Sequence, residues 1–200
     1  MKTLLLTGFE PFLKYPVNPT MKIAEELHGM KIGGYQIHSE ILPVEFSVSG
    51  DRLVEHIMAI KPDAVLSLGL SGGRFKITPE RIAINVSDGP VDNSGHAPVD
   101  EPIMEDGADG YFTNMPIRKM VDAVKKVGLP ADISNTAGAY LCNNVMYRAL
   151  HHAQQHPGLL AGFIHIPASH ELAVEHGRVP SWSHEDLKRG IVACIKVLSE

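Results

Sequence analysis

The sequence contains few cysteines and no long apolar run. Only two cysteines occur among its 200 residues, so it lacks the disulfide framework that holds small secreted domains together. The apolar run Leu4–Leu6 is soon ended by Gly8 and Glu10, which makes it shorter than the apolar centre of a secretory signal. No stretch reaches the roughly 20 apolar residues of a membrane span. We therefore expect a cytoplasmic protein without a membrane partner.

Positive charge is also scarce. The chain has 18 basic and 23 acidic residues, a formal net charge of −5, and its basic residues are spread along the sequence. A nucleic-acid surface needs clustered positive charge that displaces counterions, so a nucleic-acid partner is not expected. The remaining composition, 44% hydrophobic and 20% charged, is that of an ordinary globular protein. Its length suits a single domain over residues 1–200.

Apolar periodicity switches repeatedly between the strand pattern and the helix pattern. The predicted strands are Thr3–Thr7, Tyr35–Leu42, Ala64–Leu68, Arg81–Val86, a short one around Ala131–Ser134, and Leu159–Ile166. The predicted helices cover roughly Thr20–His28, Ser49–Ile60, Pro116–Val127, Ala139–Gln155 and a final segment that begins at Ser183. This alternation favours a single three-layer α/β/α domain, in which helices cover both faces of a largely parallel, partly mixed central sheet.

Two segments carry more specific signals. The final helix is expected to begin at Ser183 because Ser183-His184-Glu185-Asp186 has the form of a capping box. The long segment Ser87–Gly110 is rich in Asp, Glu, Gly and Pro, and its acidic residues lack the spacing of a calcium-binding loop. It is predicted to be an irregular, solvated loop, and no metal site is expected there.

Cys142 is a candidate nucleophile because of its setting. Small residues from Thr136 to Ala139 lead from a predicted strand into the helix that contains Cys142. A thiol in the first turn of a helix lies near unpaired backbone N–H groups and the positive end of the helix dipole, both of which favour the thiolate. A free cysteine is, however, more often a small buried hydrophobe. Cys194, at core-facing spacing in the last helix, fits that second description fully.

His165 and Glu80 are candidate partners for the thiol. His165 interrupts an apolar strand near its carboxyl end, where the chemistry of open parallel sheets gathers. Glu80 precedes Arg81 and an apolar strand, and a carboxylate there could orient the imidazole and stabilise its protonated form. Taken singly, His165 could equally be a core histidine, and Glu80 could form a surface ion pair with Arg81.

Gly69-Leu70-Ser71-Gly72-Gly73 matches the G-x-S-x-G motif of serine hydrolases. That motif works only where a strand turns sharply into a helix. The residues that follow, up to Pro79, are prone to form strand rather than helix. The segment is therefore interpreted as a tight glycine turn at the rim of a site, and a serine hydrolase using Ser71 remains an alternative.

Together these segments resemble the pyroglutamyl peptidase type I family, also called pyrrolidone carboxyl peptidases. The resemblance runs in order from Thr7 to about Pro167. Its carriers are Thr7–Phe12 with Asn18-Pro19, Gly72–Arg74, Ile77–Asn85, Thr136–Gly138, Cys142-Asn143 and Gly162–Pro167. Several separate motifs in the right order are more specific than any one of them, and they favour the catalytic interpretation of Cys142, His165 and Glu80.

The resemblance implies a cysteine exopeptidase that cleaves after an N-terminal pyroglutamate through a thioester, without metal or organic cofactor. Cys142 would be the nucleophile, His165 the general base and then acid, and Glu80 the residue that orients His165. The implied substrate-binding residues are Phe9, Phe12, Asn18 and Leu70. The implied partners are pyroglutamyl peptides and, as in other family members, further copies of the chain in a homotetramer.

The sequence also departs from the family pattern. Leu70 stands where a glutamine is usual, and Ser87–Asp92 lacks an arginine that family members carry in that stretch. These departures leave open a second alternative, a paralogue that binds the lactam but turns it over slowly.

Overall fold

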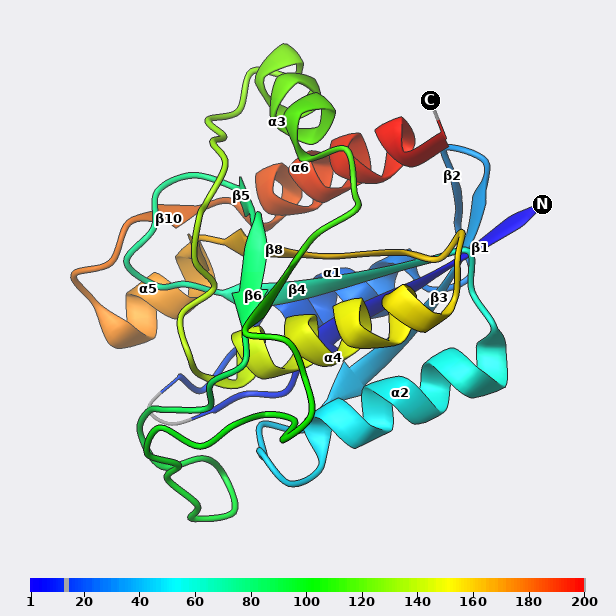
Figure 1. Cartoon of the computed structure of the whole chain (residues 1–200). Helices are drawn as coiled ribbons and strands as arrows, with labels where there is room; N and C mark the ends of the chain where they lie inside the picture. Colours follow the sequence, from blue (N-terminus) through cyan, green and yellow to red (C-terminus); the bar gives the residue numbers. More distant parts are fainter. Residues whose placement is uncertain (13–14, 200) are drawn as a thin grey trace.

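The computed structural model describes residues 1–12 and 15–199, and its centre is a six-stranded sheet in the order β2-β3-β1-β4-β8-β5 (Figure 1). The strands of this sheet are β1 (Lys2–Phe9), β2 (Lys31–Ile32), β3 (Tyr35–Leu42), β4 (Ala64–Leu70), β5 (Thr78–Pro79) and β8 (Leu160–Ile166). The inner pairs β3-β1, β1-β4 and β4-β8 are parallel, whereas β2 and β5 pair antiparallel at the two edges. The predicted α/β class with a largely parallel, partly mixed sheet is confirmed.

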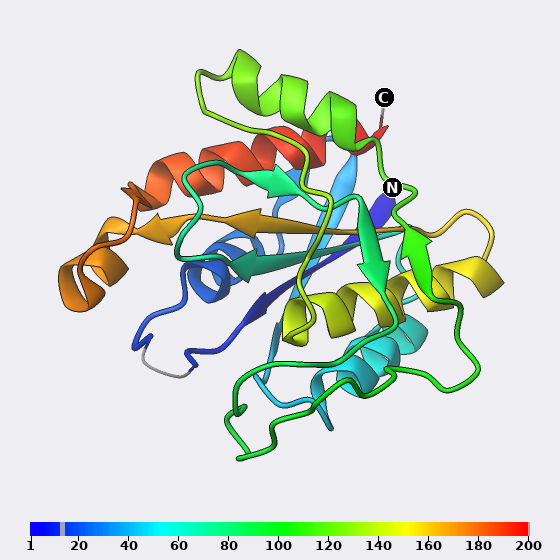
Figure 2. The same ribbon diagram turned by 60° about the vertical axis from the view of Figure 1, so that its left-hand side comes forward.

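Helices cover both faces of the sheet, as Figures 1 and 2 show. The helices are α1 (Pro19–Leu27), α2 (Ser49–Ile60), α3 (Ile117–Lys126), α4 (Leu141–Gln155), α5 (His170–His176) and α6 (His184–Lys196), followed by a 3-10 turn at Val197–Ser199. Side chains of α1, α3 and α6 belong to one apolar cluster, and those of α2 and α4 to another. Within the described residues, no helix combines the length and apolar character needed to cross a membrane.

The side-chain alternation of β1 explains why both faces need cover. Leu4 and Leu6 pack into the cluster with α1 and α6, whereas Leu5 points to the other face and packs with α2 and α4. All three leucines have no exposed surface. A strand buried on both faces reads as a continuous apolar run rather than an alternating one, which is the pattern that Leu4–Leu6 shows in the sequence.

The short strands outside the six-stranded sheet differ from those predicted from the sequence. The predicted strand at Ala131–Ser134 is wrong as a regular element, because Ala131 and Ser134 form only isolated parallel bridges with Ile77 and Glu80. The Asp132 and Ser134 amides donate to the Ile77 and Pro79 carbonyls, but Pro79 has no N–H to return the bond between them, so the ladder is interrupted. The strand expected at Arg81–Val86 is reduced to β6 (Ile82–Ile84), which pairs with β7 (Gly110–Phe112) outside the main sheet. A second small pair joins β9 (Ala168–Ser169) to β10 (Ser181–Trp182).

Helix starts also carry information. The final helix begins after Ser183, whose hydroxyl accepts a hydrogen bond from the Asp186 amide at 3.1 Å, as the capping box predicts. Helix α4 begins at Leu141 rather than at Ala139. This places Cys142 at the second helical position, inside the first turn.

The segment Ser87–Gly110 is irregular, as predicted, and Asp92 organises its first half. The Asp92 carboxylate accepts from the Phe46 amide at 2.8 Å, from the Ser94 amide and hydroxyl, and from the His96 amide. The Asp92 side chain is buried. Burial raises the pKa of Asp92, but these hydrogen bonds outweigh it, so the pKa lies below its ordinary value. The loop is thereby tied to the chain that follows β3.

Candidate active site

Strands β8 and β5 place His165 beside Glu80. Thr78 lies opposite His165 in the antiparallel β5-β8 register, and the Glu80 amide donates to the Phe163 carbonyl at 2.9 Å. The chain therefore brings the Glu80 carboxylate to the imidazole, with 2.7 Å between Oε1 and Nδ1. Both side chains are almost fully buried. Because a carboxylate only accepts, a neutral His165 donates from Nδ1 and keeps Nε2 free as a base.

The Cys142 thiol lies on Gly69, beside the Glu80-His165 pair. Gly69 on β4 lies opposite His165 on β8 in the parallel register. A Cβ placed on Gly69 would lie 2.9 Å from the Cys142 sulfur and 2.6 Å from the Phe163 ring. The thiol therefore packs against the bare backbone of the strand next to His165. Residues from α4, β8 and the segment after β5 meet at one place, as the sequence analysis expects.

Burial is the main influence on the pKa values of Cys142 and His165. The pKa of the Cys142 thiol is raised to about 12, mainly by burial and also by the Glu80 charge, whereas the Arg74 charge acts to lower it. For His165, burial lowers the pKa, the hydrogen bond and charge of Glu80 raise it, and Arg74 lowers it; the net shift is downward. The first turn of α4 favours a thiolate, but burial acts in the opposite direction and outweighs it. Both shifts favour a neutral thiol and a neutral imidazole over the ion pair.

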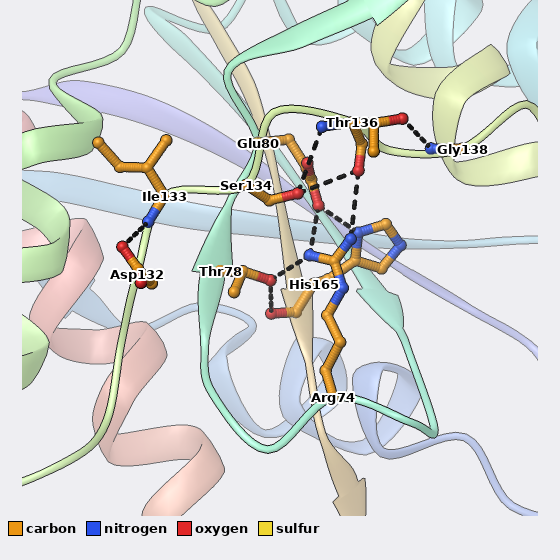
Figure 3. Close-up of polar contacts among 9 residues, drawn as sticks. All are labelled: Arg74, Thr78, Glu80, Asp132, Ile133, Ser134, Thr136, Gly138 and His165. Atoms are coloured by element: carbon orange, nitrogen blue, oxygen red, sulfur yellow. Dashed lines mark hydrogen bonds and ion pairs between the residues drawn. The ribbon is translucent and has the colours of Figure 1, made fainter.

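Arg74 completes the polar cluster, although the sequence analysis did not select it as a site residue. Its Nη1 donates to Glu80 Oε1 at 2.7 Å and also bonds the Thr78 hydroxyl, and its Nη2 donates to the Thr136 carbonyl at 3.2 Å (Figure 3). The Glu80 oxygen thus accepts from both Arg74 and His165. The signal in the sequence is modest: an arginine directly after a Gly-Gly turn and six residues before the candidate carboxylate.

A small aromatic cavity adjoins Cys142. It is lined by Phe9, Phe12, Asn18, Val44, Leu70, Tyr140, Leu141 and Cys142, and its free volume is about 20 Å³. The structure thus brings all four predicted pocket residues around one cavity with the thiol. Tyr140 and Leu141 were not predicted, although they directly precede Cys142 in the sequence; Val44 carries no comparable signal.

Asn18 has a structural task within this cavity wall. Its side-chain oxygen accepts from the Thr20 amide at 3.1 Å and the Thr20 hydroxyl at 2.8 Å, which caps α1, and its Nδ2 donates to the Glu10 carbonyl at 3.1 Å. Both ends of the amide are therefore engaged within the protein. Asn18 shapes the cavity, and its polar atoms hold α1 in place.

The turn after β4 bears on the serine alternative. Residues 71–77 form turns and irregular chain rather than a helix, and the Ser71 amide donates to the Ile166 carbonyl at 2.9 Å. The strand-turn-helix context of a nucleophile elbow is therefore missing at Ser71. The predicted glycine turn is what the structure contains.

A possible metal-ligand group lies away from this site. Glu26, His184 and Glu185 bring their ligand atoms within 4.8 Å of one another between α1 and α6. The Lys188 ammonium donates to both carboxylates at 2.9 Å. An internal cation already occupies this position, and the group has no contact with the Cys142 cavity.

Comparison with known proteins identifies close relatives. A family model for pyroglutamyl peptidase matches residues 1–200. The chain is 55% identical to the pyrrolidone-carboxylate peptidase of Oceanobacillus iheyensis, over 99% of this chain and 100% of that protein. It is 58% identical to that of Lysinibacillus sphaericus, over 98% of this chain and 96% of that protein.

Solved structures of pyroglutamyl peptidases are also similar to this chain. The crystal structure of Bacillus amyloliquefaciens pyroglutamyl peptidase I is similar with a TM-score of 0.95 at 36% identity, over 100% of this chain and 97% of that chain. A mutant pyrrolidone carboxyl peptidase from Pyrococcus furiosus is similar with a TM-score of 0.94 at 40% identity, over 98% and 97% of the two chains.

Proposed function

The chain belongs to the pyroglutamyl peptidase family of hydrolases, and we propose that it removes an N-terminal pyroglutamate, or 5-oxoproline, from peptides. Cys142 is the nucleophile, His165 the general base and then acid, and Glu80 the group that orients His165. The observation that carries this assignment is the 2.7 Å contact between His165 and Glu80, next to a glycine surface on which the Cys142 sulfur packs at the edge of an aromatic cavity.

The proposed reaction begins with the neutral thiol. As Sγ attacks the carbonyl carbon that follows the lactam ring, its proton passes to Nε2 of His165, and the carbonyl oxygen becomes an oxyanion. The Cys142 backbone N–H, in the first turn of α4, is the donor we assign to that oxyanion. Glu80 stabilises the imidazolium formed in this step. A base that accepts the proton during attack removes the need for a preformed thiolate.

The second half of the reaction releases two products. The His165 imidazolium protonates the leaving nitrogen, the C–N bond breaks, and the shortened peptide departs while a thioester remains on Cys142. A water molecule, deprotonated by His165, then attacks the thioester carbon. The C–S bond breaks, 5-oxoproline leaves, and the proton returns to the thiol.

The cavity suits the proposed substrate. A pyroglutamyl residue has no charged amino group, so its pocket needs apolar walls and few polar contacts. Phe9, Phe12 and Leu70 supply such walls beside Cys142.

The site also bears on the two alternative functions, a serine hydrolase and a paralogue that only binds the lactam. The missing helix after Ser71 argues against the serine hydrolase. The neutral, oriented His165 next to Cys142 argues against a paralogue that only binds the lactam.

By family resemblance we also propose a cytoplasmic homotetramer, which sedimentation equilibrium would test through the mass of the assembly.

A fluorogenic pyroglutamyl amide tests the proposed function. We expect wild type, Ser71→Ala and the matched cysteine control Cys194→Ala to release the fluorophore, and Cys142→Ala to lose at least about 1,000-fold in kcat. Iodoacetamide should abolish activity by alkylating Cys142. Activity in Cys142→Ala together with its loss in Ser71→Ala would instead assign the reaction to the serine. Tight binding of 5-oxoproline without turnover by wild type would assign a binding protein.

A further inference from the structure

Arg74 is the one strongly basic side chain among the described residues that bonds the Glu80-His165 pair. Glu80 is fully buried, whereas the Arg74 side chain is 26% exposed. Both the guanidinium and the imidazole use the same carboxylate oxygen, Oε1. Within the described residues the second oxygen, Oε2, is buried and has no hydrogen-bond partner. Both hydrogen bonds to the Glu80 carboxylate are therefore made to one of its two oxygens.

This sharing balances the charges of the buried cluster. The charged groups that act on His165 within the described chain are Glu80 after β5 and Arg74 from the β4-β5 connection. The Cys142 thiol from α4 packs on Gly69, which lies opposite His165 in the sheet. With Arg74 present, one cation and one anion cancel, and His165 can be neutral without leaving an uncompensated charge. Without Arg74, the cluster would be neutral only if it bound one additional proton. That proton would occupy the base that the proposed reaction requires.

Arg74 also links the two halves of the site mechanically. Its Nη2 bonds the Thr136 carbonyl at 3.2 Å, in the segment that enters α4 and carries Cys142 (Figure 3). Its Nη1 bonds the Thr78 hydroxyl, which in turn donates to the His165 carbonyl at 3.4 Å. A planar guanidinium can bond three groups in fixed directions, whereas a lysine ammonium is a single point charge. One side chain thus connects the Glu80-His165 side of the site with the chain that leads to the nucleophile.

We propose that Arg74 is a positioning residue that keeps His165 uncharged and ready to accept a proton, by sharing Glu80 Oε1 with it and by holding the Thr136 carbonyl at the entrance to α4. This inference rests on the proposed function in one respect, the role of His165 as the base. Its electrostatic part is a property of the folded protein and can be measured without substrate.

The charges of Arg74 and Glu80 determine in which direction their substitution shifts the pKa of His165. Arg74 lowers the pKa of His165 and of Cys142, whereas Glu80 raises both. Replacing Arg74 by a neutral residue should therefore raise the pKa of both His165 and Cys142, by about one unit for His165. The acidic limb of kcat/KM should move to higher pH by the same amount, since His165 stays protonated to a higher pH. Glu80→Gln should move the His165 value in the opposite direction.

An NMR titration of His165 tests the proposal directly. The imidazole signal is assigned by its loss in His165→Asn and is followed in wild type, Arg74→Met, Arg74→Gln and Arg74→Lys. We expect the midpoint to rise in both neutral variants and to stay within about 0.3 unit of wild type in Arg74→Lys, which keeps the charge. The lysine variant should nevertheless lose about tenfold in kcat, because it cannot make the three bonds at once.

Arg81→Met is the matched control. Arg81 is close in sequence to Glu80 but bonds Asn135 through its Nε at 2.7 Å, so its removal should leave the His165 midpoint unchanged. An unchanged midpoint in a folded Arg74→Met or Arg74→Gln protein would overturn the electrostatic role. Wild-type kcat in Arg74→Lys would overturn the mechanical role. A shifted midpoint without any pyroglutamyl turnover by wild type would retain the charge role of Arg74 and overturn the proposed function instead.

Discussion

At the scale of single residues, Gly69 determines how closely the Cys142 sulfur approaches the sheet. Its backbone is the surface on which the Cys142 sulfur and the Phe163 ring both pack. A methyl group there would lie at distances that side chains essentially never adopt, against a ring that is itself 1% exposed and cannot move away easily. The glycine is needed for space rather than for backbone freedom.

We therefore expect Gly69→Ala to damage both stability and catalysis. Overpacking of this kind costs about 1–3 kcal/mol in the free energy of unfolding, which urea denaturation would measure. Displacement of the thiol by about 1 Å should lower kcat about 100-fold. Gly73→Ala is the control, because a Cβ at Gly73 meets no atom within 4 Å. Equal stability and activity of the two variants would contradict this account.

The residue scale also shows how far sequence alone leads to the site. Cys142, His165 and Glu80 were each ambiguous when taken singly, and only the ordered set of motifs favoured a catalytic interpretation. Arg74 could not be selected in this way, because its role depends on a hydrogen-bonded cluster that β5 and β8 create across the fold. The charge state of Cys142 could not be predicted from the sequence either, since its helix position favours ionisation and its burial depends on how the whole chain folds.

At the scale of elements, the sequence predicted long periodic segments and missed short ones. The pattern of Ser49–Ile60 gave α2 with the same bounds, because its apolar residues recur at helical spacing. Helix α5 was missed, since only Leu172 among its seven residues is buried. Strand β5 has two residues, one of them a proline, and its strand character comes from pairing with β8 rather than from its own pattern.

The loop that contains Asp92 gives a prediction that depends on pH. Asp92 has a pKa below its ordinary value because its hydrogen bonds outweigh burial. Its stabilising contribution is therefore fully present above the unfolded pKa of about 3.9, and it is lost as the pH falls through the lower folded value. We expect Asp92→Asn to lower the free energy of unfolding by about 1–3 kcal/mol at pH 7. The difference from wild type should shrink below about pH 4.

Urea denaturation at several pH values would measure this effect. Asp106→Asn is a suitable control, because Asp106 is exposed in the same segment. Asp92→Asn should also raise KM, since Asp92 holds the Phe46 amide and the Phe46 ring packs edge-on against Tyr140 at 5.1 Å. A stability difference that persists unchanged at pH 3 would show that the carboxylate charge is not responsible.

At the scale of the whole molecule, the two cysteines lie in opposite clusters of the core. Cys194 belongs to the cluster with α1, α3 and α6 and has no exposed surface. Cys142 packs at the border of the cluster with α2 and α4 and lines the cavity. The sequence-based assignment of Cys194 to the core is confirmed. The two thiols should differ in access to solution even though burial raises the pKa of each to about 12.

We expect native protein to be alkylated by iodoacetamide at Cys142 and to be protected at Cys194. Peptide mapping by mass spectrometry should find both sites modified only in denaturing urea, because Cys194 becomes accessible only when α6 leaves the sheet. Cys194→Ala should keep the alkylation rate at Cys142. Equal rates at both sites in native protein would contradict the burial of Cys194.

The position of β8 between β4 and β5 has a consequence for biosynthesis. The ribosome completes β4 roughly 100 residues before it completes β8, an interval of about 5–20 s at usual elongation rates. During that time one edge of β4 lacks its neighbour, and unpaired edges attract other chains. The same late insertion delivers His165 to the thiol. In the reaction proposed above, a nascent chain therefore becomes able to hydrolyse its substrate only when the open edge of β4 is paired, so one step both removes the aggregation hazard and completes the proposed site.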